Sequence, residues 1–316
     1  MLDYAAARAV ATIVRTGSFE AAARALGVTP SAISQRVRNL EERLGTVLIR
    51  RGQPCTATEA GARLCRHMDH VGMLEQTLAQ HLPGMADGDA ARVTVTIATN
   101  ADSLGTWLMP ALAAHARDSG HLFQIAIDDE QHTADGLRQG RVLAAVTSLD
   151  SPVQGCAVRP LGRLRYHATA SPDFMRRHFP DGVTAAALAG TPALAFDRKD
   201  GLQLAWVRQV TGQSPVLPAH GLASTQGFVD ACRAGLGWGL NPEMLVADDL
   251  ASGRLVQMVP GTPLDVSLYW QIGRLAADRL SGLTRAVQAA AVAALLPATS
   301  GPLSNGWPAA PAAPAL

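Results

Sequence analysis

Apolar residues recur at helical spacing twice within the first 45 positions. The second run places four apolar side chains on one stripe, spaced by three or four residues: Ile33, Val37, Leu40 and Leu44. This spacing predicts a helix whose stripe faces a domain core. The opposite face is then exposed, and it carries hydroxyl, amide and guanidinium groups: Ser31, Ser34, Gln35, Arg36, Arg38 and Asn39.

The start and stop signals of these two runs predict two short helices around a tight turn. Ser18 can cap the first helix, which runs through EAAARAL to Gly27. Thr29 can cap the second, with Pro30 at its first position, where the missing N–H costs nothing. This layout is typical of a helix-turn-helix whose second helix reaches a DNA major groove. An ordinary surface helix of a small helical bundle is the alternative, because helix-turn-helix patterns are short and degenerate.

The flanks favour the DNA-binding interpretation. Residues 4–15 predict a third amphipathic helix that supports the pair, with Ala9, Ile13 and Val14 facing the same core. After Gly45, the apolar residues 47–49 predict a strand that enters a basic turn with Arg50 and Arg51 and returns through Thr56 and Thr58. Such a wing places its arginines against the phosphate backbone, where contacts add affinity but carry no sequence information. The residues that we expect to contact DNA are Ser18, Thr29, Pro30, Ser31, Ser34, Gln35, Arg36, Arg38, Arg50 and Arg51.

Several motifs in one order carry a family resemblance. They are SFEAAARALGVTPSAISQRVRNLEERLG (18–45), VLIRR (47–51), TATEAG (56–61), NADSLGTWLMPAL (100–112), DDE (128–130) and AGLGWGLNPEML (234–245). Together they resemble the LysR-type transcriptional regulators, and within them the ArgP/LysG branch, which controls export of basic amino acids. The resemblance covers residues 2–296. It implies a winged helix-turn-helix (1–58), a linker helix and hinge (59–90) and an effector-binding domain (91–297).

Charge is distributed unevenly along a chain with little net charge. The 316 residues carry a net charge of +1, are 48% hydrophobic and have a mean hydropathy of +0.10, as expected of a well-cored protein. Residues 1–66 hold ten arginines against five acidic residues, and the remainder is mildly acidic. A basic amino-terminal module is typical of nucleic-acid binding, so double-stranded DNA is the expected macromolecular partner.

Several other classes of protein lack their signals in the sequence. Charged residues interrupt the amino terminus, and no apolar run is long enough to span a membrane, so we expect a cytoplasmic, nucleoid-associated protein without a membrane partner. No HExxH, G-x-S-x-G or CxxC pattern occurs, which predicts no enzyme activity, no metal and no cofactor. The four cysteines suggest no disulfide framework, although Cys156 or Cys232 could be a redox-reactive thiol.

The region after the wing predicts one long helix. Its apolar residues are spaced by three or four: Leu64, Met68, Val71, Leu74 and Leu78. The helix either packs within the first domain or, as the resemblance implies, pairs with its copy in a homodimer or homotetramer. Residues 83–89, rich in turn formers, predict the boundary of the two modules, and residues 298–316, rich in Pro, Ala, Gly and Ser, predict a disordered tail.

Beyond residue 92 the pattern changes to short strands separated by helical stretches. Strands are expected at 93–99, 123–127, 143–148 and 192–196, and helices at 107–117 and 134–139. This alternation predicts an α/β fold. The resemblance implies two lobes of the periplasmic-binding-protein type 2, with lobe 1 at 91–167 and 267–297, lobe 2 at 168–266, and the chain crossing near 165–170 and 265–270.

Polar residues follow the ends of the expected strands, where α/β folds bind ligands. Hydroxyls and free N–H groups after residue 99 form a natural carboxylate site, and the acidic triplet at 128–130 can neutralise an ammonium or a guanidinium. Each of these residues can instead be a helix cap or part of a solvated loop. The candidate effector residues are Thr99, Asn100, Asp102, Ser103, Asp128, Glu130, Thr147, Ser148, Asp197, Thr225 and Gln226.

These observations together predict a transcriptional regulator. We expect its effector to be lysine or arginine, its target to be an amino-acid exporter gene and RNA polymerase to be a further partner. One alternative is an architectural or replication-origin DNA-binding protein. Another, from a different class, is a cytoplasmic small-molecule-binding module without a transcriptional role.

Overall fold

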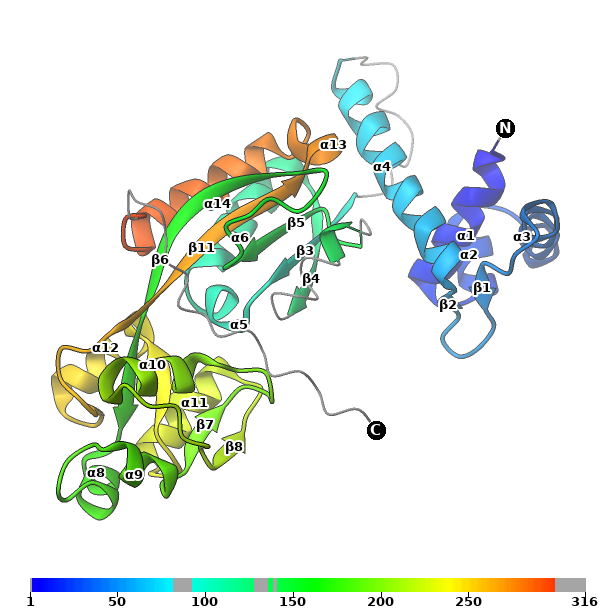
Figure 1. Ribbon diagram of the computed structural model, residues 1–316. Coiled ribbons are helices and arrows are strands. Elements are labelled where there is room, and N and C mark those ends of the chain that lie inside the picture. Colours follow the sequence, from blue (N-terminus) through cyan, green and yellow to red (C-terminus); the bar gives the residue numbers. More distant parts are fainter. Residues whose placement is uncertain (1, 82–92, 128–135, 139–140, 299–316) are drawn as a thin grey trace.

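The computed structural model describes residues 2–81, 93–127, 136–138 and 141–298. An amino-terminal helical unit is joined through the long helix α4 (Glu59–His81) to an elongated α/β part with two lobes (Figure 1). Among the described residues, no helix combines the length and the apolar character needed to cross a membrane.

Three helices form the amino-terminal unit, and each begins as its capping residues predict. The helices are α1 (Tyr4–Thr16), α2 (Phe19–Ala25) and α3 (Pro30–Leu44). The hydroxyl of Ser18 accepts the Ala21 N–H at 3.0 Å, and the hydroxyl of Thr29 accepts the Ala32 N–H at 3.2 Å. The two helices of the predicted helix-turn-helix and the supporting helix before them are therefore confirmed.

The apolar stripe of α3 is shorter than predicted. Ile33, Val37 and Leu40 are buried against α1, but Leu44 is 47% exposed. The prediction that Leu44 faces the core is wrong because this residue is the last of the helix, just before Gly45, and its side chain extends past the packed residues. The core of the unit is completed from the wing side by Leu48 and Ile49.

The wing consists of two very short antiparallel strands, β1 (Ile49–Arg50) and β2 (Thr56–Ala57). Its first strand begins two residues later than the apolar run suggested, and Val47 before it is exposed. The wing lies close to the start of α4: a Cβ at Gly61 would stand 1.9 Å from the carbonyl oxygen of Leu48. Only glycine allows this approach, so Gly61 sets the angle between wing and helix.

The long helix α4 differs along its length. Near its start, Leu64 and the buried Met68 pack against α1. Further along, Leu74 and Leu78 are 48% and 49% exposed. The first half therefore belongs to the core of the amino-terminal unit, and two leucines of the second half face outward.

The first lobe is built on the larger part of a seven-stranded sheet. Its strand order is β10 (Val256–Gln257), β6 (Cys156–Ala170), β11 (Leu264–Gly273), β5, β3 and β4, with β9 (Gly239–Pro242) also paired to β6. The strands of this lobe confirm three predicted ones: β3 (Thr94–Thr99), β4 (Leu122–Ile127) and β5 (Ala144–Thr147). Both β4 and β5 are parallel to β3, so their carboxyl ends lie at one edge of the sheet.

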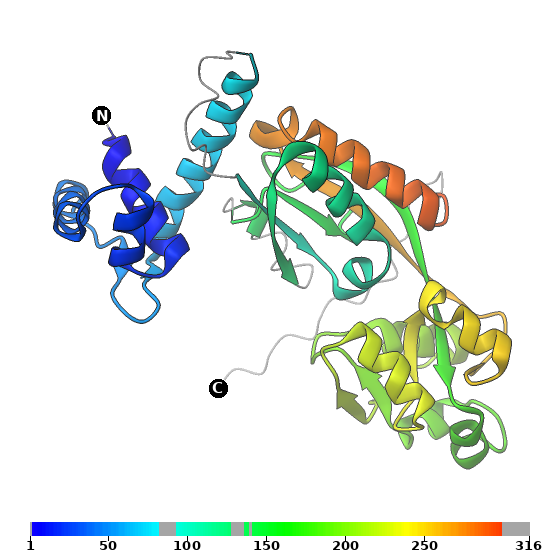
Figure 2. The same cartoon turned by 180° about the vertical axis from the view of Figure 1, so that it is seen from behind.

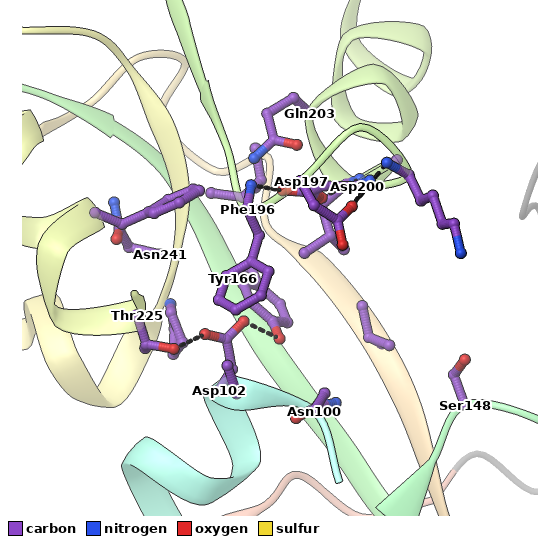
Figure 3. Close-up of a pocket in the computed structure, with 18 of the residues that line it drawn as sticks. Asn100, Asp102, Ser148, Tyr166, Phe196, Asp197, Asp200, Gln203, Thr225 and Asn241 are labelled. Carbon is purple, nitrogen blue, oxygen red and sulfur yellow. Dashed lines mark hydrogen bonds between the residues drawn. The ribbon is translucent and has the colours of Figure 1, made fainter. Parts of the chain in front are cut away.

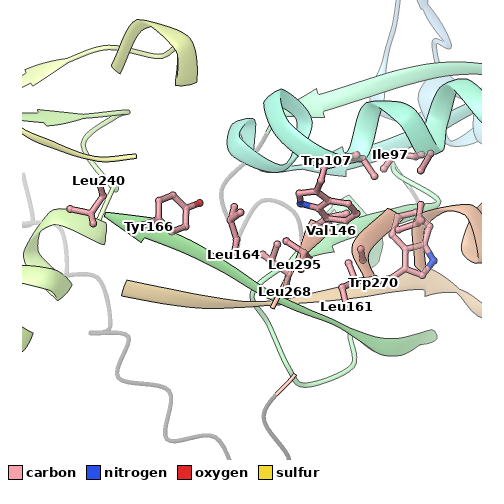
Figure 4. Close-up of a cluster of buried hydrophobic side chains, with 14 of the residues drawn as sticks. Ile97, Trp107, Val146, Leu161, Leu164, Tyr166, Leu240, Leu268, Trp270 and Leu295 are labelled. Carbon is pink, nitrogen blue, oxygen red and sulfur yellow. The ribbon is translucent and has the colours of Figure 1, made fainter. Parts of the chain in front are cut away.

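Helices cover this sheet, and aromatic side chains fill the space beneath them. The turn α5 (Ala101–Ser103) and the π-helical turn η2 (Leu104–Leu108) lead into α6 (Met109–Ser119), which packs beside α14 (Ser281–Ala294) (Figure 2). The helix predicted at 107–117 is therefore observed as α6, which begins two residues later and is preceded without a break by α5 and η2. The core centres on Ile97, Trp107, Leu268 and Trp270 (Figure 4). Residues 128–135 and 139–140 lie outside the described residues, and with them half of the helix expected at 134–139; its residues 136–138 are helical.

Two long antiparallel strands connect the lobes. They are β6 (Cys156–Ala170) and β11 (Leu264–Gly273), paired from Cys156 opposite Gly273 to Tyr166 opposite Leu264. These two strands contain residues 165–170 and 265–270, where the family resemblance implies that the chain crosses between the lobes. The pairing shifts register between Leu268 and Tyr269 beside Gly162, where a Cβ would stand 2.5 Å from the Leu296 carbonyl oxygen.

The second lobe lies at the far ends of these connecting strands. Its elements are α8 (Pro172–His178), α9 (Ala185–Ala189), β7 (Ala193–Ala195), α10 (Leu202–Thr211), β8 (Ala219–Gly221), α11 (Thr225–Arg233), β9 (Gly239–Pro242), α12 (Glu243–Ser252) and β10 (Val256–Gln257). The short turn helix α13 (Arg274–Ala277) follows the return to the first lobe. Trp206 and Trp238 are fully buried, with ring centroids 5.4 Å apart. Strand β7 confirms the fourth predicted strand, and the Gly-rich stretch before β9 forms a turn.

Candidate functional site

A cavity of about 410 Å³ lies between the two lobes. This volume is within the usual range of small-molecule sites. Its walls come from the turn after β3, the end of β5, the connecting strand β6, the segment from β7 to α10, and the start of α11. Figure 3 shows that polar side chains from both lobes point into it.

Asp102 connects the lobes at the floor of the cavity. One carboxylate oxygen accepts the Tyr166 hydroxyl at 2.9 Å, and the other accepts the Thr225 hydroxyl at 2.7 Å (Figure 3). Asp102 belongs to the first lobe, Tyr166 to a connecting strand and Thr225 to the second lobe. Burial raises the pKa of Asp102, and the two hydroxyl donors only partly offset this effect.

A second carboxyl group, that of Asp200, enters the cavity from the other lobe. Its oxygens accept the backbone N–H groups of Phe196 at 2.8 Å and Leu202 at 3.1 Å. Burial raises the pKa of Asp200, and the negative charge of Asp102 raises it further. The neighbouring Asp197 is exposed and folds its own loop, accepting the N–H groups of Lys199 and Asp200.

Two amide side chains in the cavity wall retain unused hydrogen-bonding capacity. Asn241 is fully buried; its Nδ2 donates to Thr169 at 2.9 Å, while its Oδ1 has no partner among the described residues. Gln203 is 4% exposed, and neither amide atom makes a hydrogen bond of ordinary geometry within the described part of the chain, although the amide is close enough to lower the pKa of Asp200. Buried polar groups are normally paired, so both amides are suited to receive a polar ligand.

The structure brings together some of the predicted effector residues and separates others from the site. Those that line the cavity are Asn100, Asp102, Thr147, Ser148, Asp197 and Thr225. Three do not line it: Thr99, Ser103 and Gln226. Thr99 and Ser103 are wholly buried beneath the cavity wall, and Gln226 is exposed beside Asp230 on α11, so direct ligand contact at these three positions does not fit this geometry. Asp128 and Glu130 lie outside the described residues.

Sequence reasoning missed several residues of the cavity. Tyr166 lies in the middle of a connecting strand, and Asn241 lies within β9, so neither follows the end of a parallel strand. Asp200 and Gln203 flank the first residue of α10. The RKDG sequence before that helix is a local signal for Asp200. The signal is ambiguous, because an acidic residue at this position is also typical of an ordinary helix cap.

The exposed face of α3 has the chemistry predicted for a recognition helix. Ser31, Gln35, Arg36 and Arg38 are exposed, and Ser34 is partly so. Gln35 donates to Asn39 at 2.7 Å, which orients the amide on the surface. Thr29 caps the helix, and its hydroxyl also contacts that of Ser31 at 3.1 Å.

The wing is held to this helix by a contact that the sequence pattern did not reveal. The carboxylate of Glu41 on α3 accepts the N–H groups of Leu48 at 2.7 Å and Ile49 at 3.3 Å. Arg50 and Arg51 are exposed, and the Arg51 guanidinium lies over the Phe19 ring, 5.2 Å from its centroid. The basic wing and the recognition face therefore belong to one rigid unit.

The cysteines are free thiols in the described structure. Burial raises the pKa of Cys232 to about 11, and it also raises that of Cys156. Both shifts disfavour the thiolate, which is the reactive form. Within the described ranges, no three His, Cys, Asp or Glu side chains are grouped as metal ligands.

The fold and site define a class of protein: a winged helix-turn-helix joined to a two-lobed ligand-binding domain. Residues 5–62 match the bacterial regulatory helix-turn-helix protein family of the LysR type, and residues 88–298 match the LysR substrate binding domain. The chain therefore belongs to the LysR family of transcriptional regulators, in its LysG/ArgP branch.

Three relatives illustrate this placement. The HTH-type transcriptional regulator LysG of Mycobacterium tuberculosis is 44% identical over 290 residues, which is 92% of this chain and 94% of the relative. The crystal structure of ArgP from Mycobacterium tuberculosis is 42% identical, with a TM-score of 0.75 over 95% of this chain and 100% of that one. Full-length LysG from Corynebacterium glutamicum with bound effector Arg is 38% identical, with a TM-score of 0.64 over 94% and 100% of the two chains.

Proposed function

We propose that this regulator senses a basic amino acid, arginine or lysine, in the cavity between its lobes and thereby controls transcription of an amino-acid exporter gene. The observation that carries the proposal is the Asp102 carboxyl, which receives hydroxyls from a connecting strand and from the opposite lobe but no cation among the described residues. A basic amino acid supplies that cation. The arginine in the LysG structure from Corynebacterium glutamicum supports the same chemistry.

The position of Asp102 explains how ligand and lobe arrangement are linked. The hydrogen bond from Thr225 crosses between the lobes. Gly105 of the first lobe lies against the same threonine: a Cβ added at Gly105 would stand 3.6 Å from the Thr225 Cγ2. A ligand ammonium at Asp102 competes with or reorients this contact. The effector then favours the lobe arrangement in which it binds more tightly, which is the thermodynamic requirement for a switch.

The amino-terminal unit is the DNA-binding module of this proposal. Ser31, Gln35 and Arg38 read or position the operator in the major groove, while Arg50 and Arg51 contact phosphates. The outward-facing Leu74 and Leu78 of α4 support pairing of two chains, and a homodimer or homotetramer places two recognition helices on an imperfect palindrome. The protein acts on nucleoid DNA in the cytoplasm and communicates there with RNA polymerase.

Ligand identity is tested by thermal unfolding of the full-length protein with each of the twenty amino acids and with citrulline, the neutral analogue of arginine. Arginine and lysine are expected to raise the melting temperature, because a ligand at about 100 times its Kd adds roughly 2.7 kcal/mol to stability. Citrulline is expected to have little effect. If arginine and lysine leave the melting temperature unchanged while a neutral metabolite raises it, the assignment is wrong.

The regulatory role is tested by footprinting the protein on the promoter region of the exporter gene, with and without arginine. A discrete protected site whose extent changes with arginine supports a regulator. Broad occupancy of bent AT-rich DNA without an arginine effect supports the architectural alternative instead. An absence of DNA binding supports an isolated ligand-binding module.

A further inference from the structure

We propose that Asp200 and Gln203 form a subsite on the second lobe that receives the side-chain cation of the effector and selects arginine over lysine. This inference rests on the proposed function and deepens it. Both residues line the cavity from the start of α10, opposite the turn that carries Asp102 (Figure 3).

The subsite has a fixed carboxylate. The two backbone N–H groups that donate to Asp200, from Phe196 and Leu202, hold its oxygens in place without neutralising the charge. No cation of the described residues is among the groups that shift the pKa of Asp200, whereas Asp102 acts on it as a like charge. A cationic ligand group relieves both the burial and this repulsion.

The subsite also has an unsatisfied amide. Gln203 is nine-tenths buried, lines the cavity and has no hydrogen bond of ordinary geometry among the described residues. An amide that is buried without partners costs free energy unless a ligand satisfies it. The amide lies close enough to Asp200 to lower the pKa of that carboxyl, and its Oε1 is an unpaired acceptor beside it. A ligand that donates hydrogen bonds there satisfies this oxygen.

The two buried carboxyl groups of the cavity, those of Asp102 and Asp200, assign an orientation to the ligand, whereas the charged groups of Asp197 and Lys199 lie at its exposed side. A basic amino acid carries one carboxylate and two cations. Its carboxylate matches the hydrogen-bond donors at the edge of the first-lobe sheet, which are Asn100, Thr147 and Ser148. Its α-ammonium is bonded to the same Cα as the carboxylate and matches the nearby Asp102. The remaining cation is left with Asp200. A neutral amino acid leaves Asp200 enclosed and unpaired, so the second carboxyl excludes it.

Gln203 adds the discrimination between the two basic amino acids. A guanidinium offers five N–H donors in one plane and can donate to a carboxylate and to a neighbouring amide oxygen together. The ammonium of lysine is a compact point charge with three donors and satisfies Asp200 alone. The acceptor of Gln203 therefore favours arginine.

The test is isothermal titration of the full-length protein with arginine, lysine and citrulline at fixed salt. In Gln203→Met, a substitution of similar size, the ratio of arginine to lysine affinity is expected to fall about tenfold, the value of one hydrogen bond to a charged group. The matched control is Gln209→Met on the same helix: Gln209 is exposed and outside the cavity, and the ratio is expected to stay unchanged.

Asp200→Asn tests the carboxylate. The affinities for arginine and lysine are both expected to fall by at least about tenfold, because these ligands use the charge. Citrulline is expected to bind at least as well as to the wild type, because the carboxylate that excludes neutral ligands is gone. Asp248→Asn, at an exposed position of the same lobe, is the control. Because Asp200 also accepts two backbone N–H groups, melting temperature and near-UV circular dichroism are recorded; if the variant does not fold, Gln203→Met carries the test.

The outcomes separate the two levels of the proposal. If the wild type binds neither basic amino acid, the proposed function fails. If it binds arginine and Gln203→Met leaves the arginine-to-lysine ratio unchanged, or lowers both affinities equally, the proposed function stands and the selective subsite is overturned. A folded Asp200→Asn protein with unchanged arginine affinity also overturns the subsite.

Discussion

The recognition face of α3 and the cavity between the lobes both present polar groups to a ligand, but they do so in opposite environments. Ser31, Gln35 and Arg38 are exposed on one continuous helix, and their neighbours in the sequence complete the surface. Asp102 and Asp200 are largely enclosed, come from different lobes and are surrounded by residues that lie far apart in the sequence, from Asn100 to Val266.

This difference determines how each region binds. The polar groups of the exposed helix stay hydrated in the free protein, so this face is suited to a highly charged, hydrated partner such as DNA. The enclosed carboxyls are already separated from bulk water, and a cation of matching shape gains a strong interaction there while a neutral molecule does not. In the proposed function, the exposed helix supplies affinity for DNA and the enclosed cavity discriminates between small ligands.

The most disruptive substitution should abolish DNA binding by the amino-terminal unit and leave ligand binding in the cavity intact. Ile33→Asp places an unpaired charge in the core of the amino-terminal unit, where Ile33 is fully buried, and is expected to destabilise that unit by about 4 kcal/mol or more. DNA binding should be lost in a mobility-shift assay, while calorimetric arginine binding persists. Ile33→Val, expected to cost about 1 kcal/mol, is the control. Loss of arginine binding together with DNA binding contradicts the independence of the two regions.

The next effect is directed at the cavity. Asp102→Asn keeps the size of the side chain and removes its charge, so arginine affinity is expected to fall by about 2 to 5 kcal/mol, as when one partner of a buried charge pair is lost. Titration calorimetry measures the change, with Asp248→Asn as the matched control. Operator affinity without arginine should remain within a factor of a few. An unchanged arginine Kd rules out Asp102 as a ligand group.

On the recognition face the expected effect is smaller. Arg38→Ala is expected to weaken operator binding by about 2 kcal/mol if the guanidinium reaches a base, or to reduce the salt dependence by about one ion if it reaches a phosphate. Fluorescence anisotropy at several salt concentrations distinguishes the two contacts. Arg176→Ala, at an exposed position on α8 of the second lobe, is the control. Identical binding by both variants removes Arg38 from the interface.

The cavity should also respond to pH, whereas the recognition face should not. Because the pKa values of Asp102 and Asp200 are raised, each carboxyl takes up a proton at a higher pH than in the unfolded chain. Arginine binds the carboxylates, so its affinity is expected to fall as pH drops through the raised pKa values, by up to about tenfold per pH unit for each group. Calorimetry in buffers of different ionisation heat should detect proton release on binding.

The same shifts set the direction of the stability change. In the ligand-free protein, the folded state binds protons more tightly than the unfolded state, so these two groups favour folding below the unfolded pKa, and that contribution is lost as pH rises through the raised values. Arginine should compensate for the loss at high pH. An arginine affinity that is independent of pH contradicts the role of both carboxyls.

The smallest expected effect concerns the end of the recognition helix. Leu44→Gln replaces a side chain that is 47% exposed, so chemical denaturation should show a change within about 0.5 kcal/mol. Leu40 lies on the same stripe but is buried, so Leu40→Ala should lower the free energy of unfolding by about 2 to 5 kcal/mol. A large cost for Leu44→Gln that depends on protein concentration indicates that Leu44 is covered in an oligomer.

Much of the amino-terminal unit was predictable because its determinants are local. Ser18, Thr29 and Pro30 mark helix starts by their own hydrogen-bonding chemistry, and Ile33, Val37 and Leu40 mark the buried face by spacing. The mistake at Leu44 has a local cause as well, since periodicity does not indicate where a core ends. The contact from Glu41 to the wing was missed because it depends on the path of the chain after Gly45.

Only those cavity residues that lie at the ends of parallel strands could be predicted from the sequence. Asn100, Thr147 and Ser148 follow parallel strands, and the expectation that they lie at one edge of the sheet was confirmed. Ser103 and Thr99 share that position in sequence but point into the protein interior. Tyr166, Gln203 and Asn241 carried no local signal, because their roles arise from elements that meet across the lobes.

Local sequence patterns were enough to predict the α/β class, the helix-turn-helix with its basic face, and the strand ends that line the cavity. These properties depend on hydrophobic periodicity, capping and charge, which act over a few residues. The folded protein was needed to show that Asp102 is held by Tyr166 and Thr225, that Asp200 lines the same cavity and that the Oε1 of Gln203 has no partner among the described residues. Burial and long-range pairing set the charge and the hydrogen-bonding capacity of the site, and both exist only after the two connecting strands have brought the lobes together.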